Sequence, residues 1–364
     1  NQEIASNLWI VDLDDVHNPF VVGVVSLYFG QDLPTIPISV RAHEGRAYVG
    51  NAPYRGVIVV DLQKAINEST GRLTLDESSA VTPLAGADFQ AKLQSVDYSV
   101  AVGQPSSANS VDVVDQAVQS VGPNNNPTGL MPVTFAADQS QKELIAIGFP
   151  LALDGINSLP PPDKRVLSST ATFVASPLEP GPGHIRVVQG VPIQNGSQTT
   201  KADLAVLASA SRLWIYDVTD PVNPVMKSDP LFTDLKLPNG ASAFDAEGTL
   251  AYIGIGSQIA IVDFSDPANP KLVSTIPGLG GAVGSLAVGQ GFIYTLSPTG
   301  QQSALNVSIG SPASVLFVHG QSGIADLTCA NPIVVDRSTN LMEQNAEIDF
   351  VAFGRSAPTS QQVV

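Results

Sequence analysis

Leu213-Trp214-Ile215-Tyr216-Asp217 is one copy of a five-residue phrase that recurs along the chain, an apolar run of β-branched and aromatic residues that ends in aspartate. Further copies cover residues 8–12, 57–61, 111–115 and 259–263. Their aspartates lie about 50 residues apart, with one step about twice as long, and a strand-based period of about 40 to 50 residues is typical of β-propellers. The long step is expected to hold a degenerate copy near Arg165. The repeat therefore predicts an all-β chain folded as a β-propeller.

The residues around the phrase predict a four-stranded blade. After Asp217 come Asp220-Pro221 and Asn223-Pro224, and the copy at 259–263 is followed by the same pattern. An aspartate in such a turn accepts backbone N–H groups two residues further on, and the prolines fix the reversal, so the phrase is expected to be a third strand that leads into a fourth. Two more apolar runs precede the phrase and are expected to be the first and second strands, as at residues 39–50, 241–254 and 285–294.

Length and composition favour one such domain over residues 1–364. Only 14% of the residues are charged, while 31 glycines and 28 prolines suit many short strands joined by tight turns. A propeller can occupy a chain of this length as a single domain. No run of about 18 apolar residues is present, so direct membrane insertion is not expected.

The charge balance excludes one class of partner. The chain has 33 acidic and 17 basic residues, which gives a formal net charge of −16. Nucleic acid and anionic membrane surfaces would be repelled by this charge, so neither is expected to bind. A strong acidic excess with few lysines is common in secreted and surface-displayed proteins, although solubility alone explains it equally well.

The phrase resembles the LVIVD-type repeat family of bacterial and archaeal surface proteins, and residues 213–224 and 259–270 resemble it best. The resemblance implies an extracellular or cell-surface β-propeller. It brings no catalytic residues with it.

Third strands near residues 12, 61, 115, 165, 217, 263 and 307 predict seven blades. The chain begins with a third strand, and residues from about 331 to 355 repeat the pattern of first and second strands. We therefore expect the N-terminal strands (about 8–27) and the C-terminal strands (about 331–355) to share the closing blade, which would remove two exposed sheet edges. The tail at 361–364 leaves open a further third strand, hence eight blades or a fragment of a longer array.

The chemistry-bearing residues do not form a recognisable catalytic motif. The four histidines fall at different phases of the repeat, which argues against a shared metal site, and no nucleophile elbow, zinc-binding helix or phosphate-binding loop is present. The group Asp12, Asp14 and Asp15 has the spacing of calcium ligands, but it occupies the turn where the sister repeats also carry aspartates, so a turn-stabilising role is preferred. No catalytic residue, metal or cofactor is predicted.

Binding residues are expected in the loops between second and third strands. Tyr54, Arg55 and Arg212 are the candidates, because an exposed aromatic ring and two guanidinium groups on an acidic protein are typical of binding surfaces. The predicted function is a non-enzymatic extracellular structural or recognition module, part of a larger surface or secreted assembly, that contacts other protein chains or surface glycans. The alternatives are a propeller hydrolase or lyase with a site at the channel mouth, and a carbohydrate-binding lectin.

Overall fold

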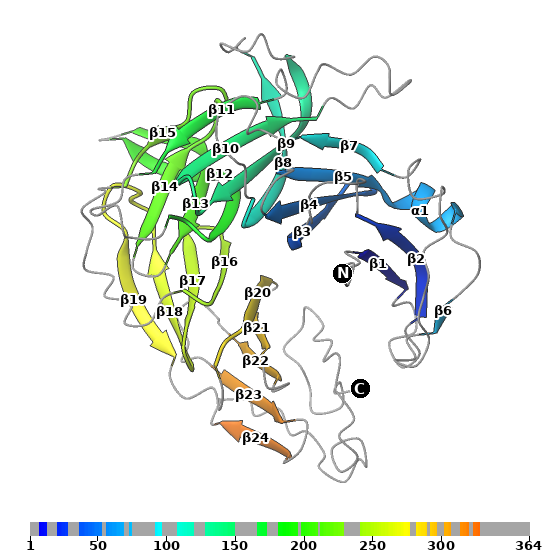
Figure 1. Cartoon of the computed structure of the whole chain (residues 1–364). Coiled ribbons are helices and arrows are strands. Elements are labelled where there is room, and N and C mark those ends of the chain that lie inside the picture. Colours follow the sequence, from blue (N-terminus) through cyan, green and yellow to red (C-terminus); the bar gives the residue numbers. More distant parts are fainter. Residues whose placement is uncertain are drawn as a thin grey trace. The chain divides into compact units, whose positions relative to one another are not determined.

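The strands of the computed structural model group into antiparallel sheets, most of which are made of strands that follow one another in the chain (Figure 1). The structure describes residues 7–12, 20–27, 36–52, 56–68, 73–74, 92–96, 108–119, 128–149, 166–172, 181–195, 198–209, 212–228, 241–276, 282–289, 292–296, 302–306, 314–319 and 323–327. The chain separates into two compact units, each of which is treated by itself. The first comprises Asn1–Gly190, Lys201–Leu207 and Trp214–Leu231, and the second Val191–Thr200, Ala208–Leu213 and Phe232–Val364.

The first unit begins with a three-stranded sheet and two complete four-stranded sheets. The three-stranded sheet has the order β1 (Asn7–Asp12), β2 (Phe20–Ser26) and β6 (Leu73–Thr74). The next sheet contains β3 (Ile36–His43), β4 (Arg46–Ala52), β5 (Val57–Asp61) and β7 (Lys92–Val96), and the helix α1 (Leu62–Glu68) follows β5. The third sheet contains β8 (Ser110–Val118), β9 (Gly129–Asp138), β10 (Glu143–Gly148) and β11 (Val166–Ala171).

Most of the next four-stranded sheet also belongs to the first unit, and the second unit continues with two more sheets. That sheet contains β12 (His184–Asn195), β13 (Gln198–Ala208), β14 (Leu213–Asp217) and β15 (Val225–Met226). The second unit has a four-stranded sheet of β16 (Ala243–Glu247), β17 (Leu250–Ile255), β18 (Gln258–Asp263) and β19 (Lys271–Ile276). Its five-stranded sheet contains β20 (Ser285–Gly289), β21 (Phe292–Leu296), β22 (Gln302–Asn306), β23 (Ser314–His319) and β24 (Gly323–Leu327).

Successive sheets within a unit pack face to face, which explains the continuous apolar run in a third strand such as β5. On β5, Val57 and Val59 pack in one cluster with residues of the β8–β11 sheet. The alternate residues Ile58 and Val60 pack in another cluster with the β1–β2 sheet. A sheet that is buried on both faces needs apolar side chains on both, so its strands lose the usual alternation of apolar and polar residues.

The same packing recurs between other neighbouring sheets. Trp214 and Tyr216 of β14 are fully or almost fully buried in a cluster with residues of the β8–β11 sheet. In the second unit, Ile259 and Ile261 of β18 pack with residues of β20 and β21. Consecutive four-stranded sheets stacked in this way are blades in a β-propeller arrangement, and the all-β prediction is confirmed.

The turn that follows the phrase is built as the sequence predicts. The Asp217 carboxylate accepts hydrogen bonds from the Thr219 backbone N–H (3.2 Å) and hydroxyl (2.7 Å). Asp263 accepts one from the backbone N–H of Ser265 at 2.8 Å. Asp220 then accepts hydrogen bonds from the Val222 backbone N–H and the Asn223 side chain, and Asp266 does the same in the next sheet. The aspartates of these two repeats therefore stabilise the reversal between third and fourth strands.

One copy of the phrase was assigned to the wrong strand. Residues 111–115 lie on β8, which is the first strand of its sheet and not the third. The third strand is β10, and the segment near Arg165 leads into β11, the fourth strand. The error arose because β8 also lies between packed sheets and is apolar on both faces. The chain does not reverse after Asp115, because β8 continues to Val118 in register with β9.

The predicted closing segment at 331–355 lies outside the described residues, and so do residues 13–19 with Asp14 and Asp15. Within the described part of the chain, no helix combines the length and apolar character needed to cross a membrane.

Candidate functional site

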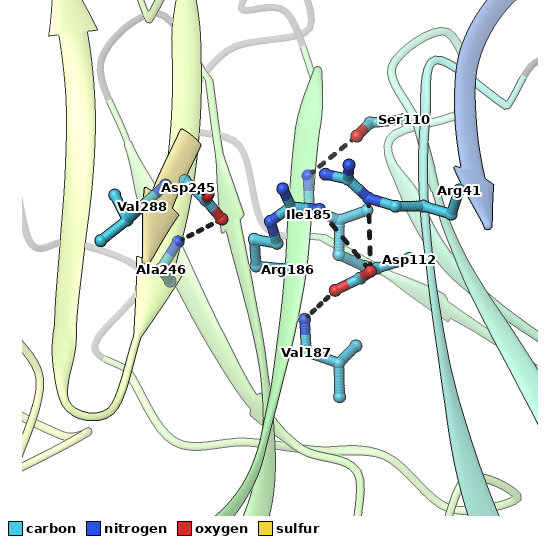
Figure 2. A network of polar contacts seen from close by, with 9 residues as sticks. All are labelled: Arg41, Ser110, Asp112, Ile185, Arg186, Val187, Asp245, Ala246 and Val288. Carbon is cyan, nitrogen blue, oxygen red and sulfur yellow. Dashed lines mark hydrogen bonds and ion pairs between the residues drawn. The ribbon is translucent and has the colours of Figure 1, made fainter. Parts of the chain in front are cut away.

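Charged side chains gather where the first strands of three sheets in the first unit meet. Arg41 lies on β3, Asp112 on β8 and Arg186 on β12 (Figure 2). The Asp112 Oδ1 atom is 3.4 Å from Arg41 Nε and 3.6 Å from Arg186 Nη1. We refer to Arg41 and Arg186 as the arginine pair.

The backbone holds this carboxylate in place. Asp112 Oδ2 accepts a hydrogen bond from the backbone N–H of Val187 at 2.7 Å, and Ser110 accepts one from the N–H of Ile185 at 3.3 Å. Among the strands that the structure describes, β8 and β12 are each paired on one side only. The carboxylate therefore satisfies a backbone donor that would otherwise be exposed on a sheet edge.

The arginine pair brings two positive charges to one carboxylate. The Asp112 and Arg186 side chains are only 13% and 14% exposed, whereas Arg41 is 36% exposed. Guanidinium groups keep their charge when they are partly buried, and they recognise carboxylate and phosphate oxygens through planar sets of donors. An incoming anion would meet Arg41 first, because it is the most exposed member of the group.

A second polar group lies beside the first, where the β3–β4 hairpin meets β8. His43 ends β3, Glu44 lies in the hairpin turn and Asp115 is on β8. One ligand atom from each residue lies within 4.8 Å of the other two, and His43 Nε2 is 3.1 Å from Asp115 Oδ1. Imidazole and carboxylate groups in this arrangement could hold a metal ion.

Tyr48 lies on β4, the second strand of the hairpin that carries His43 and Glu44. Its side chain is fully buried, and its ring contacts that of Phe149 edge to face, with centroids 5.5 Å apart. Burial raises the pKa of Tyr48, the Arg46 guanidinium opposes this shift, and the negative charges of Asp115 and Glu44 add to it. These electrostatic effects indicate that the hydroxyl faces the charged groups of the hairpin.

The second unit repeats the link between first strands without the arginines. Asp245 on β16 accepts a hydrogen bond from the backbone N–H of Val288 on β20 at 2.7 Å, and its other oxygen accepts one from the N–H of Ala246 at 2.9 Å (Figure 2). In both units, a carboxylate on the first strand of one sheet thus accepts a hydrogen bond from the first strand of the next sheet. The arginine pair is an addition to that link in the first unit.

The residues predicted from the loops are not brought together in the described structure. Tyr54 and Arg55 lie outside the described residues. Arg212 directly precedes β14 and is only 7% exposed, so it does not have the exposure on which its prediction was based. Its carbonyl accepts a hydrogen bond from the backbone N–H of Ser209 at 3.0 Å, which closes a tight turn. A binding role for these three residues remains a prediction.

Sequence reasoning missed the residues that do cluster, because it searched the loops and treated residues 111–115 as a third strand. A signal was present, since Arg41, Asp112 and Arg186 are charged residues that each have an apolar residue on either side. The metal-ligand group was not predicted, because His43 and Glu44 are grouped with Asp115, a residue about 70 positions further along the chain.

No protein family and no curated protein matches the chain by sequence. Several solved structures are similar to it. A functionally unknown protein from Desulfotomaculum acetoxidans DSM 771 is 11% identical with a TM-score of 0.46, and the match covers 85% of this chain and 74% of that one. Saccharomyces cerevisiae Sqt1 is 9% identical with a TM-score of 0.43, covering 87% and 77%. The β-propeller domain of Myceliophteria thermophila Cps50 (Swd1) is 12% identical with a TM-score of 0.39, covering 76% and 69%. At these identities and TM-scores the likeness carries no argument about function.

Proposed function

We propose that the chain is a non-enzymatic recognition module that binds carboxylate-bearing ligands through the arginine pair. The observation that carries the proposal is the convergence of Arg41 and Arg186 on Asp112 from three first strands. Side chains on paired strands are held more rigidly than side chains on loops, so they lose less conformational entropy when a ligand binds.

The ligand chemistry follows from the local charge. The chain as a whole carries −16, so an anion is repelled at most of its surface. The arginine pair is a local exception, and Arg41 is exposed enough to be reached. A carboxylate of an acidic glycan, or an acidic side chain of another protein, could bind there through guanidinium donors.

The proposed setting is extracellular, on the cell surface or in a secreted assembly. It is supported by the acidic composition and by the resemblance of residues 213–224 and 259–270 to LVIVD-type repeats. In this setting the partners are other protein chains or surface glycans.

The strands that the structure describes form six sheets, one fewer than the seven blades expected from the sequence, because residues 111–115 and the segment before β11 belong to the same sheet. The proposed scaffold is a closed β-propeller in which the two ends of the chain share a blade. It is supported by the first sheet, in which β1 pairs with β2 and, among the residues that the structure describes, has no strand on its other side. Because β1 and β2 resemble third and fourth strands, residues 331–355 would supply the first and second strands of the same blade.

The test is a binding screen of the full chain on arrays of glycans and peptides, with neutral and acidic members of each class. Wild-type protein is expected to retain a subset of acidic ligands. Arg41→Gln should weaken their binding about tenfold or more, since one charge-assisted contact is worth at least about 1.4 kcal/mol. Lys271→Gln is the control, because Lys271 is exposed on β19 and has no part in the cluster.

Circular dichroism and thermal unfolding establish that both variants fold. Unchanged binding in folded Arg41→Gln would remove the arginine pair from the binding site. A retained set made up only of neutral ligands would contradict the carboxylate chemistry.

A further inference from the structure

The second polar group, at His43, Glu44 and Asp115, has the geometry of a metal site. Two of its residues come from the β3–β4 hairpin and the third from β8, so the group joins two successive sheets of the first unit. A metal ion at this group would be a feature separate from ligand binding at the arginine pair.

The separation of His43 and Asp115 is the first observation. His43 Nε2 and Asp115 Oδ1 are 3.1 Å apart, both atoms are buried, and neither makes a hydrogen bond with acceptable geometry. Two ligand atoms that each lie about 2.1 Å from one ion, at an angle of about 95 to 110°, are about 3.1 to 3.4 Å apart. The two atoms therefore stand at the distance expected of neighbouring ligands of one ion.

The Tyr48 hydroxyl is the second observation. The side chain is fully buried, and the charged groups that act on its hydroxyl are the Arg46 guanidinium and the carboxylates of Asp115 and Glu44. In the β3–β4 pairing, Tyr48 is opposite Arg41 and His43 is opposite Arg46, which places all four side chains on one face of the hairpin. A water or other ligand on an ion bound by His43 and Asp115 would give this buried phenol a further hydrogen-bond partner.

The ligand types determine the class of ion. One imidazole nitrogen with two carboxylate oxygens suits a divalent transition ion, whereas Ca²⁺ and Mg²⁺ prefer oxygen ligands alone. Three protein ligands leave at least one coordination position for water or for a group from a partner.

We infer that His43, Glu44 and Asp115 bind a divalent transition-metal ion of the Zn²⁺ class, which clamps the β3–β4 hairpin to β8. Glu44 is exposed in the turn and supplies the outer ligand, while His43 and Asp115 supply the inner ones. The inference replaces the expectation from the sequence that the chain has no metal site.

The test is a metal titration of the full chain after treatment with a chelator. Isothermal titration calorimetry with ZnCl₂, MnCl₂ and CaCl₂ is expected to give one site per chain for Zn²⁺, weaker binding for Mn²⁺ and weakest for Ca²⁺. A saturating Zn²⁺ concentration should raise the midpoint of thermal unfolding by about 2 to 4 °C, because an ion that binds only the folded state stabilises it.

Single substitutions test which side chains bind the ion. Asp115→Asn and His43→Gln should each lower Zn²⁺ affinity at least tenfold, and Glu44→Gln by a smaller factor. Glu247→Gln and His184→Gln are matched controls, because both residues lie outside the group, and their Zn²⁺ affinity should equal that of wild type.

The outcomes separate a metal site from an ion pair. Absence of Zn²⁺ binding to the wild-type chain, or wild-type affinity in folded Asp115→Asn and His43→Gln, would overturn the inference. If those two variants fail to fold, Glu44→Gln decides, because Glu44 is exposed in the turn and its substitution removes no packing. Undiminished Zn²⁺ affinity in Glu44→Gln would overturn the three-ligand site.

Discussion

The carboxylate of Asp245 accepts a hydrogen bond from the backbone N–H of Val288, 2.7 Å away, and so connects the first strands of two successive sheets. Asp112 makes the same contact with Val187, also at 2.7 Å, in the other unit. Each aspartate satisfies a backbone donor on the outer side of a strand that, in the described part of the chain, is the last strand of its sheet. The contact therefore takes the place of a backbone hydrogen bond that a neighbouring strand would otherwise supply.

Removing this acceptor should destabilise the chain. In Asp245→Ala the N–H of Val288 loses its partner, and an unsatisfied buried donor costs about 1 to 3 kcal/mol. Urea unfolding measured by fluorescence should show a lower midpoint. Glu247→Ala is the control, because this exposed residue of the same strand should change stability by less than about 0.5 kcal/mol. Equal stability of the two variants would contradict the role given to Asp245.

A glycine at the end of a second strand allows the next sheet to approach closely. A Cβ atom at Gly50 would lie 2.6 Å from the Ala108 carbonyl oxygen and 2.6 Å from Ser39 Oγ. Since a backbone atom cannot move aside cheaply, Gly50→Ala should cost about 1 to 3 kcal/mol. Gly183→Ala is the matched control, because its nearest atom would be 3.5 Å away. Thermal unfolding measures both, and a Gly50→Ala protein as stable as Gly183→Ala would refute the close approach.

Acid should weaken the turn after β14. Burial by itself would raise the pKa of Asp217, but hydrogen bonds from Thr219 and the nearby Lys227 ammonium outweigh it and hold the pKa below the ordinary value of 3.8. The Lys227 Nζ is 3.1 Å from Asp217 Oδ2. A lowered pKa means that Asp217 stabilises the fold above the pKa of the unfolded chain, and that this contribution is lost as the pH falls through the folded value.

The matching variant is Asp217→Asn. At pH 7 it should be less stable than wild type by less than about 1 kcal/mol, because the ion pair is partly exposed. The difference should shrink as the pH falls below about 4. Denaturant unfolding at a series of pH values measures it, and a difference that grows in acid would contradict the assignment.

High pH should destabilise the fold through ionisation of the Tyr216 hydroxyl. Burial raises the pKa of Tyr216 to about 12, from an ordinary value of 10.0. Its hydroxyl donates a hydrogen bond to the carbonyl of Ala171 at 3.2 Å. The phenol is thus favoured in its neutral form by folding, so its contribution is complete below about pH 10 and is lost as the pH rises toward about 12.

Phenylalanine has no ionisable hydroxyl, so Tyr216→Phe lacks this loss of stability at high pH. The free energy of unfolding of the variant should fall less steeply between about pH 10 and 12 than that of wild type. The other tyrosines contribute equally to both proteins. Equal slopes in urea unfolding over this range would show that Tyr216 ionises normally.

Much of the blade could be predicted from the sequence, because its signals are local. The apolar run up to Asp217 and the turn through Asp220 specify a third strand and a reversal within a few residues. Whether residues 111–115 form the first or the third strand of their sheet could not be predicted in this way. An apolar strand between two packed sheets has the same composition whether it is the first or the third of its blade, and only its pairing with β9 distinguishes the two.

The candidate site depends on contacts between residues far apart in the chain. Arg41 and Asp112 belong to different sheets, and so do Asp112 and Arg186. Their proximity follows from the alignment of first strands in successive blades, which required the correct phase of β8. Once that phase is known, a charged residue inside an apolar first strand is a signal that the sequence does contain.

The proposed ring of blades is tested most directly by a crystal structure of the full chain. The account predicts that residues 331–355 form two antiparallel strands beside β1, which complete a four-stranded blade with β1 and β2. A structure in which another segment pairs with β1, or in which residues 331–355 lie in a sheet apart from it, would contradict the account.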